Sequence, residues 1–335
     1  MGLKTYYEDD ADLSLIQNRR VAVIGYNAQA EAHAHNLRES GVEVVVGLAA
    51  TGADNERESA AEDGFPVLEY AEAADWAHLV MVLEPEYEIA DSFGREIAPH
   101  LEAGDALFFA HGEGVHFEMV TLPQEVTVGV VAFQGSGKRV RRQFEDGKGV
   151  PSFIAIAQDP DGTGEKLALS YAAALGGARA GVMVTSPAAI AVSEIFGQQA
   201  ITTGGVEALL TNAFDTLVGA GYPPELAYFN CVHGLSAAAE QIATGGFTAL
   251  HEAGSRTAEA GGYLAGGRVV GEDALKRLAE VLGDIEDGTF VRRRADLAGS
   301  DDKLGKERAE RAAHPVEKAG ADMRALMSWV PQRRN

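Results

Sequence analysis

Short β-branched runs alternate with amphipathic stretches through the first 185 residues. The runs are RVAVIGY (20–26), VEVVVGL (42–48), HLVMVLE (78–84), ALFFAHG (106–112), VTVGVVAF (126–133), PSFIAIAQ (151–158) and ARAGVMVT (178–185). Each run has the length and residue types of a strand. Their alternation with helical stretches predicts an α/β domain with a parallel, doubly wound sheet of the Rossmann type.

The pattern changes near Pro187, where the β-branched runs stop. Ala-rich segments with helical spacing follow, at 188–201, 205–222, 224–244 and 273–297. We therefore expect a Rossmann-like dinucleotide-binding domain over 1–184 and an all-α domain over 185–335. The helices are apolar on more faces than one sheet domain could cover, which predicts a homodimer through the helical domain.

Composition narrows the function classes. The chain has 335 residues, and 28 Lys and Arg stand against 50 Asp and Glu, a net charge of -22. That charge repels nucleic acid and anionic membranes, so we expect neither as a partner and favour a small-molecule substrate. No apolar run approaches the roughly 18 residues of a membrane span, and the N-terminus has no signal-peptide pattern. With its one cysteine, Cys231, the chain is predicted to be cytoplasmic.

The turn after the first strand has the spacing of a dinucleotide-binding loop but not its residues. A Gly-x-Gly-x-x-Gly fingerprint would place glycines where this chain has Gly25, Asn27 and Ala30. The next helix would still present its N-terminal N–H groups to a phosphate, whereas the Asn27 side chain would stand where the backbone must approach closely. The residues that we expect to contact a dinucleotide here are Gly25, Tyr26, Asn27, Gln29 and Ala30.

The chain resembles ketol-acid reductoisomerases of the short bacterial form over nearly its whole length. The matching stretches include VAVIGY, AHAHNLRESGVEVVVGL, IAPHLEAGDALFFAHGEGVHF, VRRQFEDGKGVPSFIAI, GGARAGV, DTLVGAGYPPELAYFNCVH, LGDIEDGTF and HPVEKAGADMRALMSW. The resemblance implies a Rossmann-like domain followed by a knotted helical domain that dimerises. It also implies a two-step reaction, in which two magnesium ions hold the substrate during alkyl migration and NADPH then reduces the resulting ketone.

The chain departs from this family where the resemblance implies metal ligands. The family motif DLFGE reads EIFGQ here, so that Glu194 keeps a carboxylate and Gln198 is an amide. The motif YFECLHE reads YFNCVHG, which puts Asn230 and Gly234 at the other two ligand positions. One carboxylate of four remains, so we expect no bound magnesium and no conversion of acetolactate.

Other positions match or differ from the catalytic and substrate-binding residues that the resemblance implies. His111, in FAHGEGVHF, matches a histidine beside the nicotinamide and suits proton transfer, and Gly112 follows it. Ser255 matches a substrate-binding serine, whereas Gln134 replaces a lysine. We expect catalytic roles for His111, Glu194 and Ser255. The predicted substrate pocket comprises Gln134, Gln198, Asn230, His233 and Arg256.

The loop after the second predicted strand indicates the cofactor. Members that use NADPH carry GLRPGSSS, whose arginine and serines hold the ribose phosphate, whereas this chain has GLAATGAD. Thr51 is the one hydroxyl left, and Asp54 would repel a 2′-phosphate while accepting from a ribose hydroxyl. We therefore expect NAD(H) rather than NADP(H), unless Arg57 folds back onto the loop.

These observations favour a metal-independent reductase that acts on a C=O or C=N bond, in a specialised natural-product pathway. Three alternatives remain open. The first is a divergent ketol-acid reductoisomerase of valine and isoleucine synthesis. The second is a non-redox conversion of a dinucleotide-like substrate in the cofactor groove, and the third is a non-catalytic pseudoenzyme.

Overall fold

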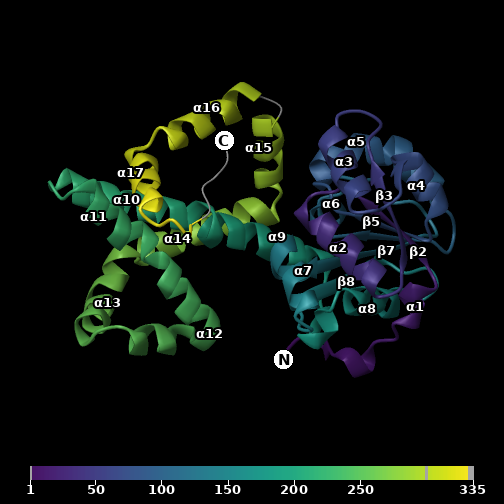
Figure 1. Cartoon of the computed structure of the whole chain (residues 1–335), viewed down its shortest axis with the longest axis horizontal. Coiled ribbons are helices and arrows are strands. Elements are labelled where there is room, and N and C mark those ends of the chain that lie inside the picture. The colour runs from purple at the N-terminus through teal and green to yellow at the C-terminus, as the bar shows by residue number, and fades with distance from the viewer. Residues whose placement is uncertain (1, 299–300, 331–335) are drawn as a thin grey trace. The chain divides into compact units, whose positions relative to one another are not determined.

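The computed structural model describes residues 2–298 and 301–330, which divide into two units at 193/194. Unit 1 covers Met1–Ser193 and holds the sheet, and unit 2 covers Glu194–Asn335 and is helical (Figure 1). Helix α9, Pro187–Gly197, runs across this division. The Rossmann-like sheet domain followed by a helical domain is confirmed. None of the described helices has the length and apolar character needed to cross a membrane.

Within the described residues, nine strands form one sheet in the order β1-β9-β8-β7-β6-β5-β2-β3-β4. Their bounds are β1 Thr5–Tyr6, β2 Arg20–Ile24, β3 Glu43–Leu48, β4 Val67–Glu69, β5 Leu79–Val82, β6 Ala106–Phe109, β7 Thr127–Phe133, β8 Ser152–Gln158 and β9 Val182–Val184. The pairs from β4 through β7 are parallel. In contrast to the all-parallel prediction, β8 is antiparallel to β7 and β1 is antiparallel to β9.

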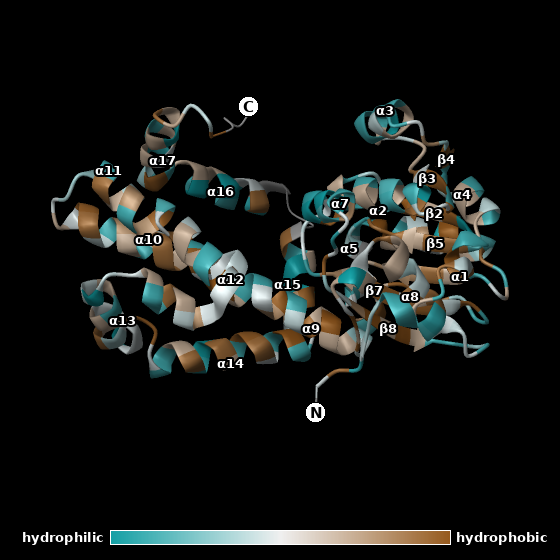
Figure 2. Cartoon of the chain, turned by 60° about the horizontal axis from the view of Figure 1, so that its bottom comes forward, coloured by the Kyte–Doolittle hydropathy of each residue, from teal (hydrophilic) through white to brown (hydrophobic). Residues whose placement is uncertain are grey.

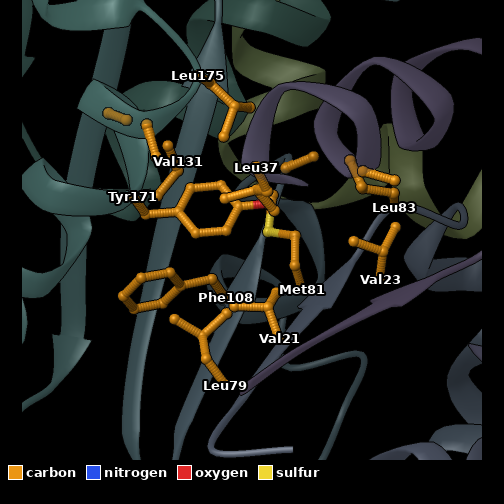
Figure 3. Close-up of a cluster of buried hydrophobic side chains, with 14 of the residues drawn as sticks. Val21, Val23, Leu37, Leu79, Met81, Leu83, Phe108, Val131, Tyr171 and Leu175 are labelled. Atoms are coloured by element: carbon orange, nitrogen blue, oxygen red, sulfur yellow. The ribbon is translucent and has the colours of Figure 1, made fainter. Parts of the chain in front are cut away.

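Helices cover both faces of the sheet. Those of unit 1 are α1 Ser14–Gln17, α2 Ala28–Glu39, α3 Asp54–Glu62, α4 Tyr70–Trp76, α5 Glu86–Ser92, α6 Glu113–His116, α7 Gly137–Glu145 and α8 Gly164–Ala174, with short helices η1 Glu8–Asp10, η2 Phe93–Ile97, η3 Ala98–His100 and η4 Gly177–Arg179. Successive strand residues point to opposite faces, so Phe108 joins one buried cluster and Phe109 the other. Figure 3 shows the first cluster, in which Tyr171 of α8 packs beside Phe108 and Met81.

Unit 2 contains helices and π-helical turns. Their bounds are η5 Gln198–Thr202, α10 Gly204–Gly219, α11 Pro224–Ala227, η6 Tyr228–His233, α12 Leu235–Ala253, α13 Arg256–Val269, α14 Glu272–Glu286, α15 Thr289–Ala298, α16 Asp301–Ala312 and α17 Pro315–Ala325. Its buried cluster is small and comprises Phe214, Ala227, Tyr228 and Ala319. Figure 2 shows hydrophobic and hydrophilic residues alternating along α14.

Candidate active site

The strand order reverses at β2, which marks the crevice of unit 1. Strand β2 pairs in parallel with β3 on one side and with β5 on the other. The loops after these strands therefore diverge at the carboxyl edge of the sheet, and doubly wound folds bind their ligands at such a switch point. Gly25 and Asn27 follow β2, and Glu84 follows β5.

Gly25 is the residue of the first loop that must be glycine. Its φ is +93°, a left-handed value that favours glycine. A Cβ at this position would lie 2.7 Å from Cγ of Glu84. The Glu84 side chain therefore packs directly against the turn and would have to move if Gly25 were any larger residue.

Asn27 is the N-cap of α2. Its Oδ1 accepts from the backbone N–H of Gln29 at 2.9 Å and of Ala30 at 3.2 Å, and its Nδ2 donates to the carbonyl of Leu83 at 2.8 Å. The backbone at Asn27 has φ -77° and ψ 177°, which any residue adopts. The missing glycine is thus not a source of strain, because the side chain turns back to cap the helix.

The other loop residues divide between core and surface. Tyr26 is 6% exposed and its hydroxyl donates to Oδ2 of Asp63 at 2.7 Å. Ala30 is fully buried, and Gln29 is partly exposed. The side chains of Tyr26 and Ala30 therefore belong to the core, and what these two residues can offer a nucleotide is their backbone.

A group with metal-ligating side chains lies between α2 and the end of α3. Atoms of Glu31, His35 and Asp63 lie within 4.8 Å of one another. Arg38 lies 3.1 Å from Nδ1 of His35, and because a guanidinium can only donate, Nδ1 accepts and Nε2 carries the proton. That proton faces Oδ2 of Asp63 at 3.4 Å. Hydrogen bonds within the chain therefore explain why these side chains lie together. They also engage both ring nitrogens of His35, so neither is available to a metal ion.

A positively charged side chain of α3 contacts the loop after β3. Thr51 and Asp54 are both exposed. Arg57 folds back, and its Nη2 donates to the carbonyl of Ala49 at 3.0 Å. A positive charge therefore lies beside the loop that meets the ribose in Rossmann folds, where Asp54 alone would repel a phosphate.

Glu84 is a crevice residue that the sequence analysis missed. It is partly buried at the end of β5, and the Tyr70 hydroxyl donates to its Oε1 at 2.7 Å. Burial raises the pKa of the Glu84 carboxyl, with the charges of Glu56 and Glu88 adding to the effect while the Tyr70 bond opposes it. A glutamate at the end of the predicted strand HLVMVLE was the signal, because ligands bind at the carboxyl ends of such strands.

His111 and Gly112 follow β6 at the same edge of the sheet. His111 is partly buried, and Gly112 is buried against α9, where a Cβ would lie 2.5 Å from the Pro187 carbonyl oxygen. This contact fixes the turn that carries His111. Gln134 follows β7 and is exposed, and its backbone N–H donates to the Pro151 carbonyl at 2.8 Å.

His33 lies fully buried on α2, and the sequence analysis did not single it out. Its Nδ1 is 2.9 Å from the Tyr171 hydroxyl, and its Nε2 has no hydrogen-bond partner in the described part of the chain. Burial, with a smaller contribution from the charge of His111, lowers the pKa of His33 to about 3. His33 is therefore neutral throughout the physiological range.

In unit 2, two positions implied as metal ligands fall within π-helices. Gln198 is exposed and begins η5, and Asn230 is exposed within η6, with its Nδ2 donating to the Leu226 carbonyl at 2.9 Å. Glu194 is partly buried on α9, and Gly234 follows η6. Single π-helical turns often occur at functional sites, which marks these segments independently of any motif.

The remaining predicted site residues of unit 2 lie on two elements. Ser255 caps α13 by accepting from the Ala258 N–H at 3.1 Å, and Arg256 is exposed beside it. His233 is exposed at the end of η6, with its ring 5.5 Å from that of Phe229, and Cys231 is partly buried. The fold thus groups His233 with Asn230 on η6.

A glycine turn at the switch point of a Rossmann-type sheet, followed by a helical unit, is typical of nicotinamide-dependent oxidoreductases. Family models agree along the chain. The model described as "Acetohydroxy acid isomeroreductase, NADPH-binding domain" matches residues 15–181, and that described as "Ketol-acid reductoisomerase, C-terminal domain" matches residues 191–329. The chain belongs to the ketol-acid reductoisomerase family.

Individual relatives match over nearly full length. The chain is 49% identical over 331 residues to proteins of Corynebacterium urealyticum and Mycolicibacterium smegmatis, both named "Ketol-acid reductoisomerase (NADP(+))", with 98% of each chain covered. It also resembles the structure of an NADH-preferring ketol-acid reductoisomerase from an uncultured archean. That match has a TM-score of 0.93 and 33% identity, and it covers 97% of this chain and 100% of the other.

Three sequence predictions are corrected by these relatives. The metal-independent reductase of a specialised pathway is wrong, because proteins half identical over the whole chain are named ketol-acid reductoisomerases. The preference for NAD(H) is also wrong, because the same relatives are named as NADP(+) enzymes. The exception named for Arg57 applies, because its side chain folds back onto the GLAATGAD loop. The exclusion of magnesium, which rested on the missing carboxylates, is wrong as well, because the relatives are named for the reaction for which the family resemblance implies magnesium ions.

Proposed function

We propose that this protein is an NADP-dependent ketol-acid reductoisomerase, which converts acetolactate to a dihydroxy acid by alkyl migration and hydride transfer. The observation that carries the proposal is the 49% identity over 98% of the chain to relatives of that name. Identity spread over both units favours a retained reaction, since a fold alone does not fix a function. Branched-chain amino acid synthesis is the pathway that this reaction would serve.

In unit 1, the proposal assigns the nucleotide to the crevice at β2. The backbone of Gly25 and the first turn of α2 would face the pyrophosphate, and Arg57 would supply positive charge toward a 2′-phosphate. Thr51 would offer a hydroxyl, and the backbone of Gly112 would lie beside the nicotinamide. NADPH supplies the hydride when it is bound. His111, at the end of β6, is the group that we expect to move the accompanying proton.

The finer part of the proposal is that this chain is a divergent member. Where the family resemblance implies four carboxylates, the chain has Glu194, Gln198, Asn230 and Gly234, which supply one negative charge. This donor set does not fit two magnesium ions held as four carboxylates would hold them, because hard cations depend on charged oxygen ligands. We expect Glu194 and Ser255 to contact the substrate.

The proposal includes a homodimer formed through the helical unit. Helices α12 and α13, which are fully described, contain no buried residue. Phe247 is 71% exposed and Leu264 is 78% exposed. Apolar side chains exposed on neighbouring helices favour a second copy as their cover. The domain boundary predicted at 184/185 and the cytoplasmic location remain predictions.

The test is product formation from acetolactate with NADPH over a range of magnesium concentrations. We expect the dihydroxy acid to form, with half-maximal activity at a higher magnesium concentration than in the variant Gln198→Glu, Asn230→Glu, Gly234→Glu, which regains the lost charges. Circular dichroism of both proteins is the control for folding. If the folded natural protein makes no dihydroxy acid at any magnesium concentration, the proposed function is wrong.

A further inference from the structure

The Asn27 side chain uses backbone donors that an anion would otherwise bind. The first four N–H groups of a helix have no partner within it, and these groups bind phosphates at helix N-termini. In α2, two of them, at Gln29 and Ala30, already donate to Oδ1 of Asn27. The Asn27 oxygen therefore lies where an oxygen of a bound pyrophosphate would accept the same two bonds.

The same amide also joins the two sides of the crevice. Its Nδ2 donates to the Leu83 carbonyl at 2.8 Å, at the end of β5. One side chain thus connects the start of α2 to the strand on the other side of the switch point. Three hydrogen bonds hold it, in a backbone conformation without strain. The arrangement is a closed cap, because both polar ends of the amide are satisfied within the chain.

We propose that the Asn27 side chain competes internally with the dinucleotide pyrophosphate at the N-terminus of α2, and that NADPH binds only when this cap opens. The inference rests on the proposed function for the identity of the nucleotide. It assigns to Asn27 the control of cofactor affinity. A residue without a side chain at this position would leave both N–H groups ready for the ligand.

The size and sign of the effect follow from the bonds that change. Binding must exchange the Asn27 contacts for contacts to the phosphate, so Asn27→Gly is expected to tighten NADPH binding about tenfold, the effect of one or two hydrogen bonds. Asn27→Asp keeps the capping oxygen and adds a negative charge at the pyrophosphate position. It is expected to weaken binding about tenfold or more.

The experiment is a calorimetric titration of the full-length protein and these two variants with NADPH. Adenosine 2′-monophosphate, which has the ribose phosphate but no pyrophosphate, serves as the matched ligand. The inference predicts that its affinity is the same in all three proteins. Asn27→Ser is included because a serine hydroxyl can cap the helix but is too short to reach Leu83, so its NADPH affinity should lie between those of the natural protein and Asn27→Gly.

Melting temperatures show whether each variant is folded. If Asn27→Gly does not fold, Asn27→Ser is used to test the inference. Unchanged or weaker NADPH binding by a folded Asn27→Gly or Asn27→Ser would overturn the inference, as would an equal gain for adenosine 2′-monophosphate. If the predicted series is found but acetolactate is not converted, the proposed function fails and the inference stands. If no variant binds NADPH, both fail.

Discussion

The two units of this chain differ in how they bury apolar surface. In unit 1, alternate strand residues fill clusters on both faces of the sheet, and Phe108 and Phe109 are each fully buried. In unit 2, the buried cluster has four members, while Tyr263 and Leu264 of α13 are 66% and 78% exposed. Unit 1 therefore has a large core of its own, whereas unit 2 has a small one and exposes apolar side chains. This difference is the observation behind the proposed homodimer.

The largest effect is expected in the core of unit 1. Phe108→Ala removes a fully buried ring that packs against Tyr171 at 6.0 Å between centroids. The cavity should lower the free energy of unfolding by about 3–5 kcal/mol. Chemical denaturation measures this loss. The control is Leu3→Ala, at a position that is 50% exposed in the same unit, and an equal loss there would contradict the assignment of the core.

A charge on α13 should break the proposed dimer. Leu264→Asp places a carboxylate in the apolar surface that a second copy would cover, so we expect the dissociation constant to rise roughly a hundredfold. Light scattering at micromolar concentration reads the mass directly. Leu3→Asp, equally charged but on unit 1, should leave the mass unchanged. A natural protein that is monomeric in this experiment would overturn the account of unit 2.

Acid should destabilise unit 1 through His33. The pKa of His33 in the folded chain is about 3, below the ordinary 6.5. Between these pH values the imidazole binds a proton in the unfolded chain but not in the folded chain. This contribution to stability is present above pH 6.5 and is lost as pH falls toward 3, by about 1.4 kcal/mol per pH unit. His33→Gln keeps a partner for Tyr171 but does not titrate. Denaturation at several pH values should give a smaller slope for the variant, and equal slopes would exclude His33 as the cause.

The smallest effect is expected at the crevice. The pKa of Glu84 is raised above its ordinary 4.5, so the folded state loses stability as pH rises from 4.5 through the folded value. Glu84→Gln keeps an acceptor for Tyr70 and should raise the free energy of unfolding at pH 8, with no gain below pH 4. Glu88→Gln, on exposed surface, should change it less. A gain that persists at pH 4 would show that charge is not the cause.

Much of the fold was predictable because strands and helices carry periodic patterns. The seven predicted strands correspond to β2, β3 and β5 through β9. Strands β1 and β4, of two and three residues, are too short for a pattern to emerge. The antiparallel direction of β8 was also missed, because alternation in sequence does not encode strand direction. It depends on which neighbour the strand pairs with in three dimensions.

The site was less predictable because its details are tertiary contacts. Asn27 directly precedes a predicted helix, which is a recognised N-cap signal, but its capping bonds to Gln29 and Ala30 were not predicted. Its bond to Leu83, the return of Arg57 onto the β3 loop and the position of Glu84 join residues whose contacts no local pattern specifies. The prediction of a changed reaction relied on three altered residues at motif positions. It gave less weight to the resemblance over the rest of the chain, which is 49% identical to a named relative over 98% of its length.

The most direct test of the account separates the two halves of the proposed reaction. Purified protein with NADPH and magnesium is given either acetolactate or the ketone that alkyl migration would produce from it, and the oxidation of NADPH is followed with each. The account predicts that both compounds are converted to the same dihydroxy acid, with acetolactate requiring more magnesium. Reduction of the ketone without any conversion of acetolactate would contradict the proposal that this chain is a ketol-acid reductoisomerase.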